Sequence, residues 1–276
     1  MMASMSTSAT STPSSTTPST TRLARTVAIT SGKGGVGKTF VSANLAAALT
    51  RQGLKVLVLD ADLGLANLDV VLNLYPKITL HDVFTGKAEL EEAILPAPGG
   101  FSVLLAGSGL VEYSRLTPEV RDQLHSIMEA VKPRFDVLLI DTGAGISDVV
   151  LYAVSLAHEV VVVATPEPTS MTDAYATIKV LCSQQNRDQI NLVVNQVTRS
   201  GDGRAICNQL QQVVDRFVQS PSGQSPRLNF IGDVPLDSSV REAVQKRQLL
   251  LELHPGSAAS QGIVQIATRL LARQSA

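Results

Sequence analysis

Apolar residues fall along this chain in short solid runs, separated by longer stretches in which they recur every three or four positions. The solid runs predict buried strands at residues 26–30, 55–60, 101–106, 136–141, 158–164, 189–195 and 228–232. The helical spacing predicts helices at residues 40–51, 80–84, 90–95, 117–131, 147–157, 171–182, 203–218, 237–246 and 257–273. Strands that are apolar on both faces and alternate with helices are typical of a mostly parallel sheet covered on both sides. We therefore predict a three-layer, doubly wound α/β fold.

Polar residues mark where some of these helices begin. Thr117 followed by Pro118 predicts a helix that starts with a side-chain cap and proline in its first turn. For the helix at residues 171–182 we expect the cap at Thr169 or Ser170.

The predicted last helix, residues 257–273, carries an apolar stripe flanked by Arg269 and Arg273. Helices that lie on a membrane surface usually have more basic residues and bulky aromatic anchors. The stripe therefore favours docking on the protein's own domain over a membrane contact. Its residues are Ile263, Ile266, Ala267, Leu270 and Leu271.

Composition divides the chain into a low-complexity tail and a domain. Residues 1–25 are mostly Ser, Thr, Ala, Met and Pro, and we expect them to be disordered. Residues 26–276 carry 21 of the 23 basic side chains and all 24 acidic ones, a net charge of −3. This charge argues against direct DNA binding. No apolar run approaches the ~18 residues of a membrane-spanning helix, and there is no signal peptide, so we expect a cytoplasmic protein.

A glycine-rich loop lies between the first predicted strand and the first predicted helix. Residues 32–39 complete the spacing G-x-x-x-x-G-K-[ST] of a phosphate-binding loop. Backbone N–H groups and the helix dipole favour an anion there, while Lys38 can reach the β- and γ-phosphates and the Thr39 hydroxyl can bind Mg²⁺. The predicted cofactors are ATP and Mg²⁺. The predicted nucleotide contacts in this segment are Gly32, Lys33, Gly34, Gly35, Val36, Gly37, Lys38, Thr39 and Phe40.

The same loop contains a second lysine, Lys33, which a plain phosphate loop does not need. With it the motif reads K-G-G-x-G-K-T and resembles the deviant Walker A signature of the MinD/ParA class of P-loop ATPases. The resemblance implies a slow Mg-dependent ATPase, activated by dimerisation or by a partner, that forms a homodimer with ATP. Lys33 would then reach the nucleotide of the partner subunit. The alternative is a solvated loop lysine.

Three acidic residues end predicted strands close to this loop. Asp60 and Asp62 follow the second strand, and Asp141 ends the fourth. In the class that the chain resembles, the acid at Asp62 positions the attacking water, and the one at Asp60 lies near the Mg²⁺ shell; the alternative for Asp60 is that it caps the following turn. Asp141 would contact Mg²⁺ through water, and the N–H of Gly145 would sense the γ-phosphate.

Weaker matches to the class extend the predicted nucleotide site. Asn195 matches an asparagine that reads adenine, although a strand-end turn former is the alternative. Glu167 matches an acid near the partner's ribose, with an exposed loop acid as an equal alternative. The segment 232–237 matches the loop whose backbone flanks adenine, and it supplies Val234, Pro235 and Asp237.

Residues 59–70, 80–83, 167–175 and 240–246 resemble the FlhG/FleN branch of this class, which sets flagellar number and placement. The resemblance implies a peripheral position on the inner membrane face and contact with a flagellar GTPase (FlhF-like) or an enhancer-binding transcription regulator. The apolar stripe described above makes any membrane contact weak or indirect. A division-site MinD and a chromosome- or plasmid-partition ParA are close alternatives. An iron–sulfur carrier ATPase would need paired cysteines, and Cys182 and Cys207 lack that spacing.

Overall fold

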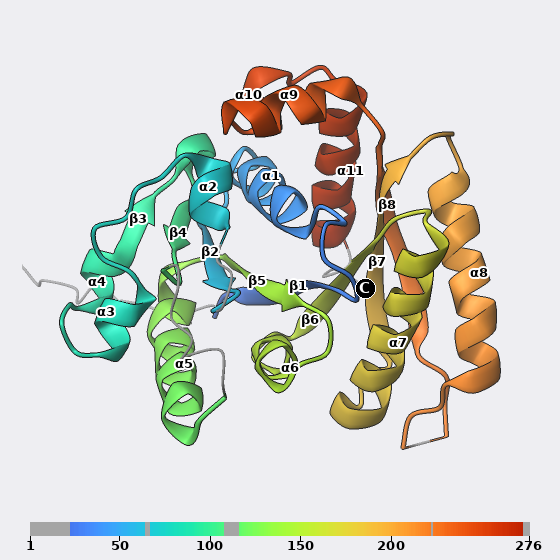
Figure 1. Cartoon of the computed structure of the whole chain (residues 1–276), viewed down its shortest axis with the longest axis horizontal. Helices are drawn as coiled ribbons and strands as arrows, with labels where there is room; N and C mark the ends of the chain where they lie inside the picture. Colours follow the sequence, from blue (N-terminus) through green and yellow to red (C-terminus); the bar gives the residue numbers. More distant parts are fainter. Residues whose placement is uncertain (1–22, 64–66, 108–115, 222, 273–276) are drawn as a thin grey trace, which may run out of the picture.

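The computed structural model describes residues 23–63, 67–107, 116–221 and 223–272, and an eight-stranded sheet forms its centre (Figure 1). The strand order is β3-β4-β2-β5-β1-β6-β7-β8, and every neighbouring pair is parallel except β3 with β4. The strands are β1 (Arg25–Ser31), β2 (Val56–Ala61), β3 (Ile94–Pro96), β4 (Ser102–Leu104), β5 (Val137–Ala144), β6 (Glu159–Ala164), β7 (Gln189–Val197) and β8 (Arg227–Pro235). The predicted mostly parallel α/β sheet is confirmed.

Helices cover both faces of the sheet, and each face has its own apolar core (Figure 1). One face carries α1 (Lys38–Thr50), α2 (Leu68–Leu72), α9 (Ser238–Lys246), α10 (Leu250–Leu253) and α11 (Ala258–Ala272). The other carries α3 (Leu80–Phe84), α4 (Leu90–Ala93), α5 (Pro118–Val131), α6 (Asp148–Ser155), α7 (Pro168–Gln185) and α8 (Asp202–Phe217). Short 3₁₀ turns occupy Pro98–Gly100 and Lys132–Arg134. The described residues therefore form three layers.

The central strands bring the predicted acids together. β5 lies between β1 and β2, and its register places Asp141 opposite Ile29 on one side and Asp60 on the other. Because parallel strands end at the same edge, the loops that follow β1, β2 and β5 share that edge.

Two sequence predictions about element boundaries were wrong. The predicted helix at residues 90–95 ends at Ala93, and Ile94 and Leu95 belong to β3, which pairs antiparallel with β4. Helix α7 begins at Pro168 with Glu167 as its N-cap residue, rather than at a cap on Thr169 or Ser170. Proline is favoured at the first helical position, and the Ser170 hydroxyl instead accepts a hydrogen bond of 2.9 Å from the Thr165 N–H.

The C-terminal helix α11 packs against β8 and α1. Its stripe residues Ile263, Ile266 and Leu270 are buried in the core of that face. A Cβ on Gly262 would lie 2.6 Å from the Asp233 carbonyl oxygen, so helix and strand approach as closely as glycine allows. Arg273 lies outside the described residues. No helix in the described part of the chain is both long and apolar enough to cross a membrane.

Candidate functional site

The glycine-rich loop runs from β1 into α1, and its conformation needs glycine at two positions. Gly35 and Gly37 have φ angles of 81° and 87°, in the left-handed region that favours glycine. The Asn195 side chain lies directly behind Gly37, where a Cβ would collide with its Nδ2. That Nδ2 donates a 2.8 Å hydrogen bond to the Val36 carbonyl, so Asn195 fixes the loop from β7.

Two other glycines in the loop differ in their surroundings. A Cβ on Gly32 would collide with the backbone carbonyl of Asp173 in α7, so glycine is needed there for packing. A Cβ on Gly34 would meet nothing within 4 Å. Helix α7 is therefore seated directly on the start of the loop, whereas Gly34 faces open space.

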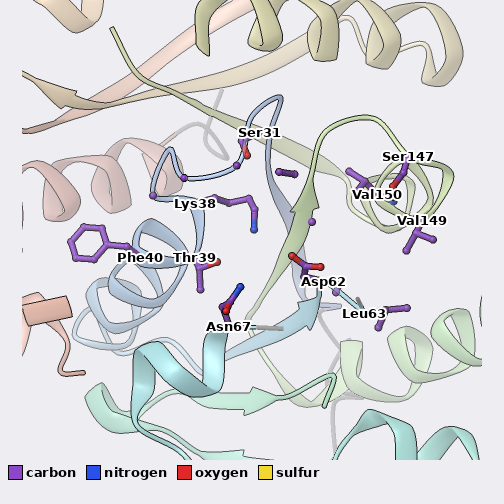
Figure 2. Close-up of a pocket in the computed structure, with 16 residues that line it drawn as sticks. Ser31, Lys38, Thr39, Phe40, Asp62, Leu63, Asn67, Ser147, Val149 and Val150 are labelled. Carbon is purple, nitrogen blue, oxygen red and sulfur yellow. Dashed lines mark hydrogen bonds between the residues drawn. The ribbon is translucent and has the colours of Figure 1, made fainter. Parts of the chain in front are cut away.

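A cavity of about 720 Å³ lies between this loop and the ends of β2 and β5. Figure 2 shows the side chains of Lys38, Thr39, Asp62 and Asn67 converging on the same space, while the Phe40 ring points away from Asp62. The remaining lining residues are Ser31, Gly34, Gly35, Gly37, Ala61, Leu63, Gly143, Ala144, Ser147, Val149 and Val150. The site thus joins a cationic loop to two acidic strand ends.

Lys38, which lines this cavity, forms a buried ion pair with Asp141, which is not among the lining residues. Lys38 Nζ lies 3.0 Å from Asp141 Oδ1, and the two side chains are 9% and 2% exposed. The Ser42 hydroxyl donates a 2.7 Å hydrogen bond to the same carboxylate oxygen. The loop lysine therefore has a protein counter-ion, which it would exchange for phosphate oxygens when an anion binds.

Asp60 is buried beside this pair. Its pKa is raised well above the usual carboxyl range, first because burial penalises the charged form and second because Asp141 lies nearby; Lys38 opposes the shift. Its Oδ1 accepts a 3.1 Å hydrogen bond from the Asp62 N–H, so Asp60 helps to position Asp62. Asp62 lines the 720 Å³ cavity, whereas Asp60 lines a different cavity of about 430 Å³.

The loop after β5 is tied to the glycine-rich loop. The Gly145 N–H donates a 2.8 Å hydrogen bond to the Ser31 carbonyl, and Gly145 has a φ angle of 91°. The positive φ of Gly145 is a backbone conformation that residues other than glycine rarely adopt. For this N–H to bind a phosphate, its hydrogen bond to Ser31 would have to break.

Lys33 is paired at the surface with the start of α7. Its Nζ lies 3.0 Å from Glu167 Oε2 and 3.0 Å from Thr169 Oγ1. The Lys33 and Glu167 side chains are 38% and 62% exposed, so water screens their attraction. Lys33 is not among the residues that line the cavity.

Several predicted nucleotide contacts do not line the cavity. Asn195 holds the loop, Val234 is buried, and Glu167 pairs with Lys33. Asp237 caps α9 through Ser239, with a 2.9 Å hydrogen bond to its N–H, and neither Asp237 nor Pro235 is among the lining residues. Roles for these residues toward adenine or ribose stay predictions.

Sequence reasoning missed Asn67. It lies at the N-cap position of α2 and faces the cavity together with Asp62 (Figure 2). The available signal was an asparagine just before the short apolar run 68–72. Gly64, Leu65 and Ala66 of the same segment lie outside the described residues.

The buried Lys38, the Thr39 hydroxyl and the Asp62 carboxylate around a cavity of this size suit a nucleoside triphosphate with Mg²⁺. The left-handed loop glycines leave the backbone open to phosphate oxygens. The Thr39 hydroxyl lines the cavity, and the Asp141 carboxylate lies beside Lys38; both are hard oxygen groups of the kind that Mg²⁺ prefers. The residues present therefore fit both groups.

Comparisons with known proteins identify the family. The chain is 42% identical to the antiactivator FleN of Pseudomonas aeruginosa over 88% of this chain and 85% of that protein. It is 36% identical to the flagellum site-determining protein YlxH of Helicobacter pylori, over 90% and 82% of the two chains. It is 34% identical to the septum site-determining protein MinD of Bacillus subtilis, over 90% of each.

Solved structures agree with these relatives. The cell division ATPase MinD of Pyrococcus furiosus matches with a TM-score of 0.74 and 28% identity, over 91% of this chain and 100% of that one. MinD of Pyrococcus horikoshii, solved in complex with Mg-ADP, matches with a TM-score of 0.73 and 29% identity, over 92% and 99%. A ParA family model, described as NUBPL iron-transfer P-loop NTPase, matches residues 22–271. The chain belongs to the ParA family of P-loop NTPases.

Proposed function

We propose that this protein is an ATP-binding and ATP-hydrolysing switch that dimerises with ATP and regulates flagellar number or placement. Its glycine-rich loop and Lys38 would hold the triphosphate, while Thr39 and Asp141 would hold Mg²⁺, with Asp60 behind them. Bound Mg²⁺ neutralises charge on the phosphoryl oxygens. The fit of these residues and the complex of the P. horikoshii relative with Mg-ADP support this assignment.

Asp62 is the proposed residue that orients the attacking water. It reaches the cavity opposite Lys38 (Figure 2). Its backbone N–H donates a hydrogen bond to the side chain of Asp60. A carboxylate fixed in this way can accept a hydrogen bond from water without reorganisation. We propose that hydrolysis is slow in the single chain and is accelerated by dimerisation or by a partner.

The position of Lys33 carries the proposal of a dimer. Its ammonium group is at the surface, does not line the cavity, and contacts the exposed Glu167 and Thr169. Exposed ion pairs of this kind contribute little, at most about 1 kcal/mol, so they are exchanged at low cost. In the dimer, Lys33 would leave this pair for the phosphates of the opposite nucleotide, and Glu167 would become available to the partner's ribose.

Light scattering tests the dimer. We expect a monomer with ADP and a dimer with a non-hydrolysable ATP analogue. Asp62→Ala should retain ATP binding and accumulate the dimer in ATP itself, because hydrolysis is slowed. Lys33→Ala should lose dimer-dependent hydrolysis, whereas Lys179→Ala, a lysine elsewhere on α7, should behave like the unsubstituted protein. The same mass in both nucleotides would refute the dimer.

The flagellar role rests on the two flagellar relatives, FleN and YlxH. We propose a cytoplasmic protein that works with a flagellar GTPase (FlhF-like) or an enhancer-binding transcription regulator, with weak or indirect contact to the inner membrane face. Deleting the gene in its own organism should change the number or position of flagella. Normal flagella in the deleted strain would refute this role.

A MinD-type division role, or a ParA-type partition role, is the second candidate, supported by the 34% identity to B. subtilis MinD. The same deletion distinguishes it, because misplaced septa or chromosome loss would replace the flagellar defect. Iron transfer, which appears in the description of the family model, finds no support in the cysteines. Cys182 and Cys207 are both buried, and the described residues hold no cluster of three or more His, Cys, Asp or Glu suited to a metal ion.

A further inference from the structure

Asn67 reaches the nucleotide cavity from the start of α2. It is the N-cap residue of that helix, and an asparagine at this place usually accepts a hydrogen bond from a backbone N–H of the first turn. Here the side chain makes no capping hydrogen bond and instead lines the cavity of about 720 Å³. Helix capping therefore does not explain why an asparagine stands at this position.

The backbone around Asn67 is firmly placed. Leu68 and Leu72 are 0% and 2% exposed and belong to the same apolar core as helix α1. The Asn67 carbonyl accepts a 3.1 Å hydrogen bond from the Val71 N–H. The residue itself is exposed, so its amide reaches the cavity from a fixed backbone position. A group held in this way needs little reorganisation when a substrate arrives.

The cavity has two kinds of side chain around the same space. Lys38 and Thr39 come from the glycine-rich loop and α1, whereas Asp62 and Asn67 come from the side of β2 and α2 (Figure 2). An ionised Asp62 can only accept hydrogen bonds, while an amide both accepts and donates and carries no charge. Asn67 thus adds an acceptor to this side of the cavity without a second negative charge that would repel phosphate.

Hydrolysis requires the attacking water in one orientation. Its oxygen must face the γ-phosphorus in line with the leaving group, so both of its O–H groups point away from the phosphorus and need acceptors. A single carboxylate, Asp62, fixes one O–H direction and leaves the water free to rotate about that hydrogen bond. A second acceptor removes this rotation.

We propose that Asn67 is a second water-orienting residue, whose side-chain oxygen accepts one O–H of the attacking water while Asp62 accepts the other. This role rests on the proposed ATPase function. The water oxygen bonds to the γ-phosphorus, and the bond from that phosphorus to the β,γ-bridging oxygen breaks, its electron pair leaving with ADP. One water proton moves to Asp62 and then to the released phosphate, whereas Asn67 gains no proton.

Kinetics and nucleotide binding of the full-length protein with Mg²⁺ test this role. Asn67→Ala should lower kcat about tenfold or more, because one of the two contacts to the water is lost. Binding of a non-hydrolysable ATP analogue should stay within about twofold, while ADP with aluminium fluoride, which mimics the phosphoryl group in transfer, should bind more weakly by the same factor as kcat falls. Asn208→Ala, at an exposed asparagine on α8, should change none of these values.

Asn67→Asp separates the acceptor from the charge. It keeps an acceptor oxygen in the same place but adds a negative charge, so it should weaken binding of the ATP analogue and yet retain more of kcat than Asn67→Ala. Should the alanine variant not fold, this difference between affinity and kcat decides, because aspartate has the shape of asparagine. A kcat lowered about tenfold or more by Asn67→Asp would then refute the acceptor role.

Three results would overturn the proposal. They are an unchanged kcat in Asn67→Ala, an equal loss of affinity for the ATP analogue and for ADP with aluminium fluoride, or a raised Mg²⁺ requirement for nucleotide binding, which would place Asn67 at the metal instead. If the unsubstituted protein hydrolyses no ATP, the proposed function itself fails. Hydrolysis that is present and unaffected by Asn67→Ala refutes only the role of Asn67.

Discussion

The buried pair of Lys38 and Asp141 predicts that the loop lysine stabilises the protein before any nucleotide binds. Lys38→Met keeps most of the volume and removes the charge, so Asp141 is left buried beside Asp60 without its cation. Removing one partner of a buried pair costs about 3–5 kcal/mol. The hydrogen bond from Ser42 remains, so we expect the lower end, about 3 kcal/mol. For a chain of this size that corresponds to a fall in melting temperature of about 6–12 °C.

A double-mutant cycle separates this effect from lost packing. Lys38→Met/Asp141→Asn removes both charges and should recover to within about 1 kcal/mol of the unsubstituted protein. Lys246→Met breaks an exposed pair with Glu242 and should leave the melting temperature unchanged. Urea denaturation without nucleotide provides the measurement. A Lys38→Met protein within about 1 kcal/mol of the unsubstituted one would show that the ion pair has no structural role, contrary to the reasoning from burial.

Three further predictions concern stability and nucleotide affinity. Asn195→Ala removes the hydrogen-bond donor to the Val36 carbonyl, so the free energy of ATP binding should weaken by about 1–3 kcal/mol in calorimetry. Unchanged binding would contradict the role of Asn195 in holding the loop. The folded state holds the Asp60 proton more tightly than the unfolded chain because the pKa is raised, so stability without nucleotide falls as pH rises above the ordinary carboxyl range. Asp60→Asn should stabilise the protein at neutral pH and flatten this slope in urea titrations; an unchanged slope would contradict the assignment. Ile266→Ala should cost about 2–5 kcal/mol by thermal denaturation, whereas truncating the half-exposed Val264 should cost far less.

The strand and helix pattern predicted the fold well because parallel strands in this sheet are buried on both faces. Each solid apolar run became a strand. The order of the strands in the sheet depends on long-range packing, so no local pattern in the sequence predicts it. One of the two errors arose at a short element. Residues 94–96 pair with β4 as an edge strand, and three residues are too few to show a period of two.

The site was predictable where function depends on local spacing. The glycine-rich loop and the acids at strand ends were found, because each acid directly follows a buried run. The contacts among them were not predictable. Lys38 and Asp141 are 103 residues apart, and Asn195 and Val36 are 159 apart. Such pairs follow from strand order and register, which a single sequence does not reveal.

The contrast between Gly32 and Gly34 affects how substitutions in the loop are interpreted. Asp173 of the same chain fills the space beside Gly32, whereas a methyl group on Gly34 would meet nothing within 4 Å. A variant library selected only for folding would therefore keep alanine at Gly34 and discard it at Gly32. If a second selection, for activity, also discards alanine at Gly34, then a group from another molecule must occupy the space beside Gly34 when the protein is active. The effect of alanine at Gly34 therefore distinguishes what folding requires at this position from what binding of another molecule requires.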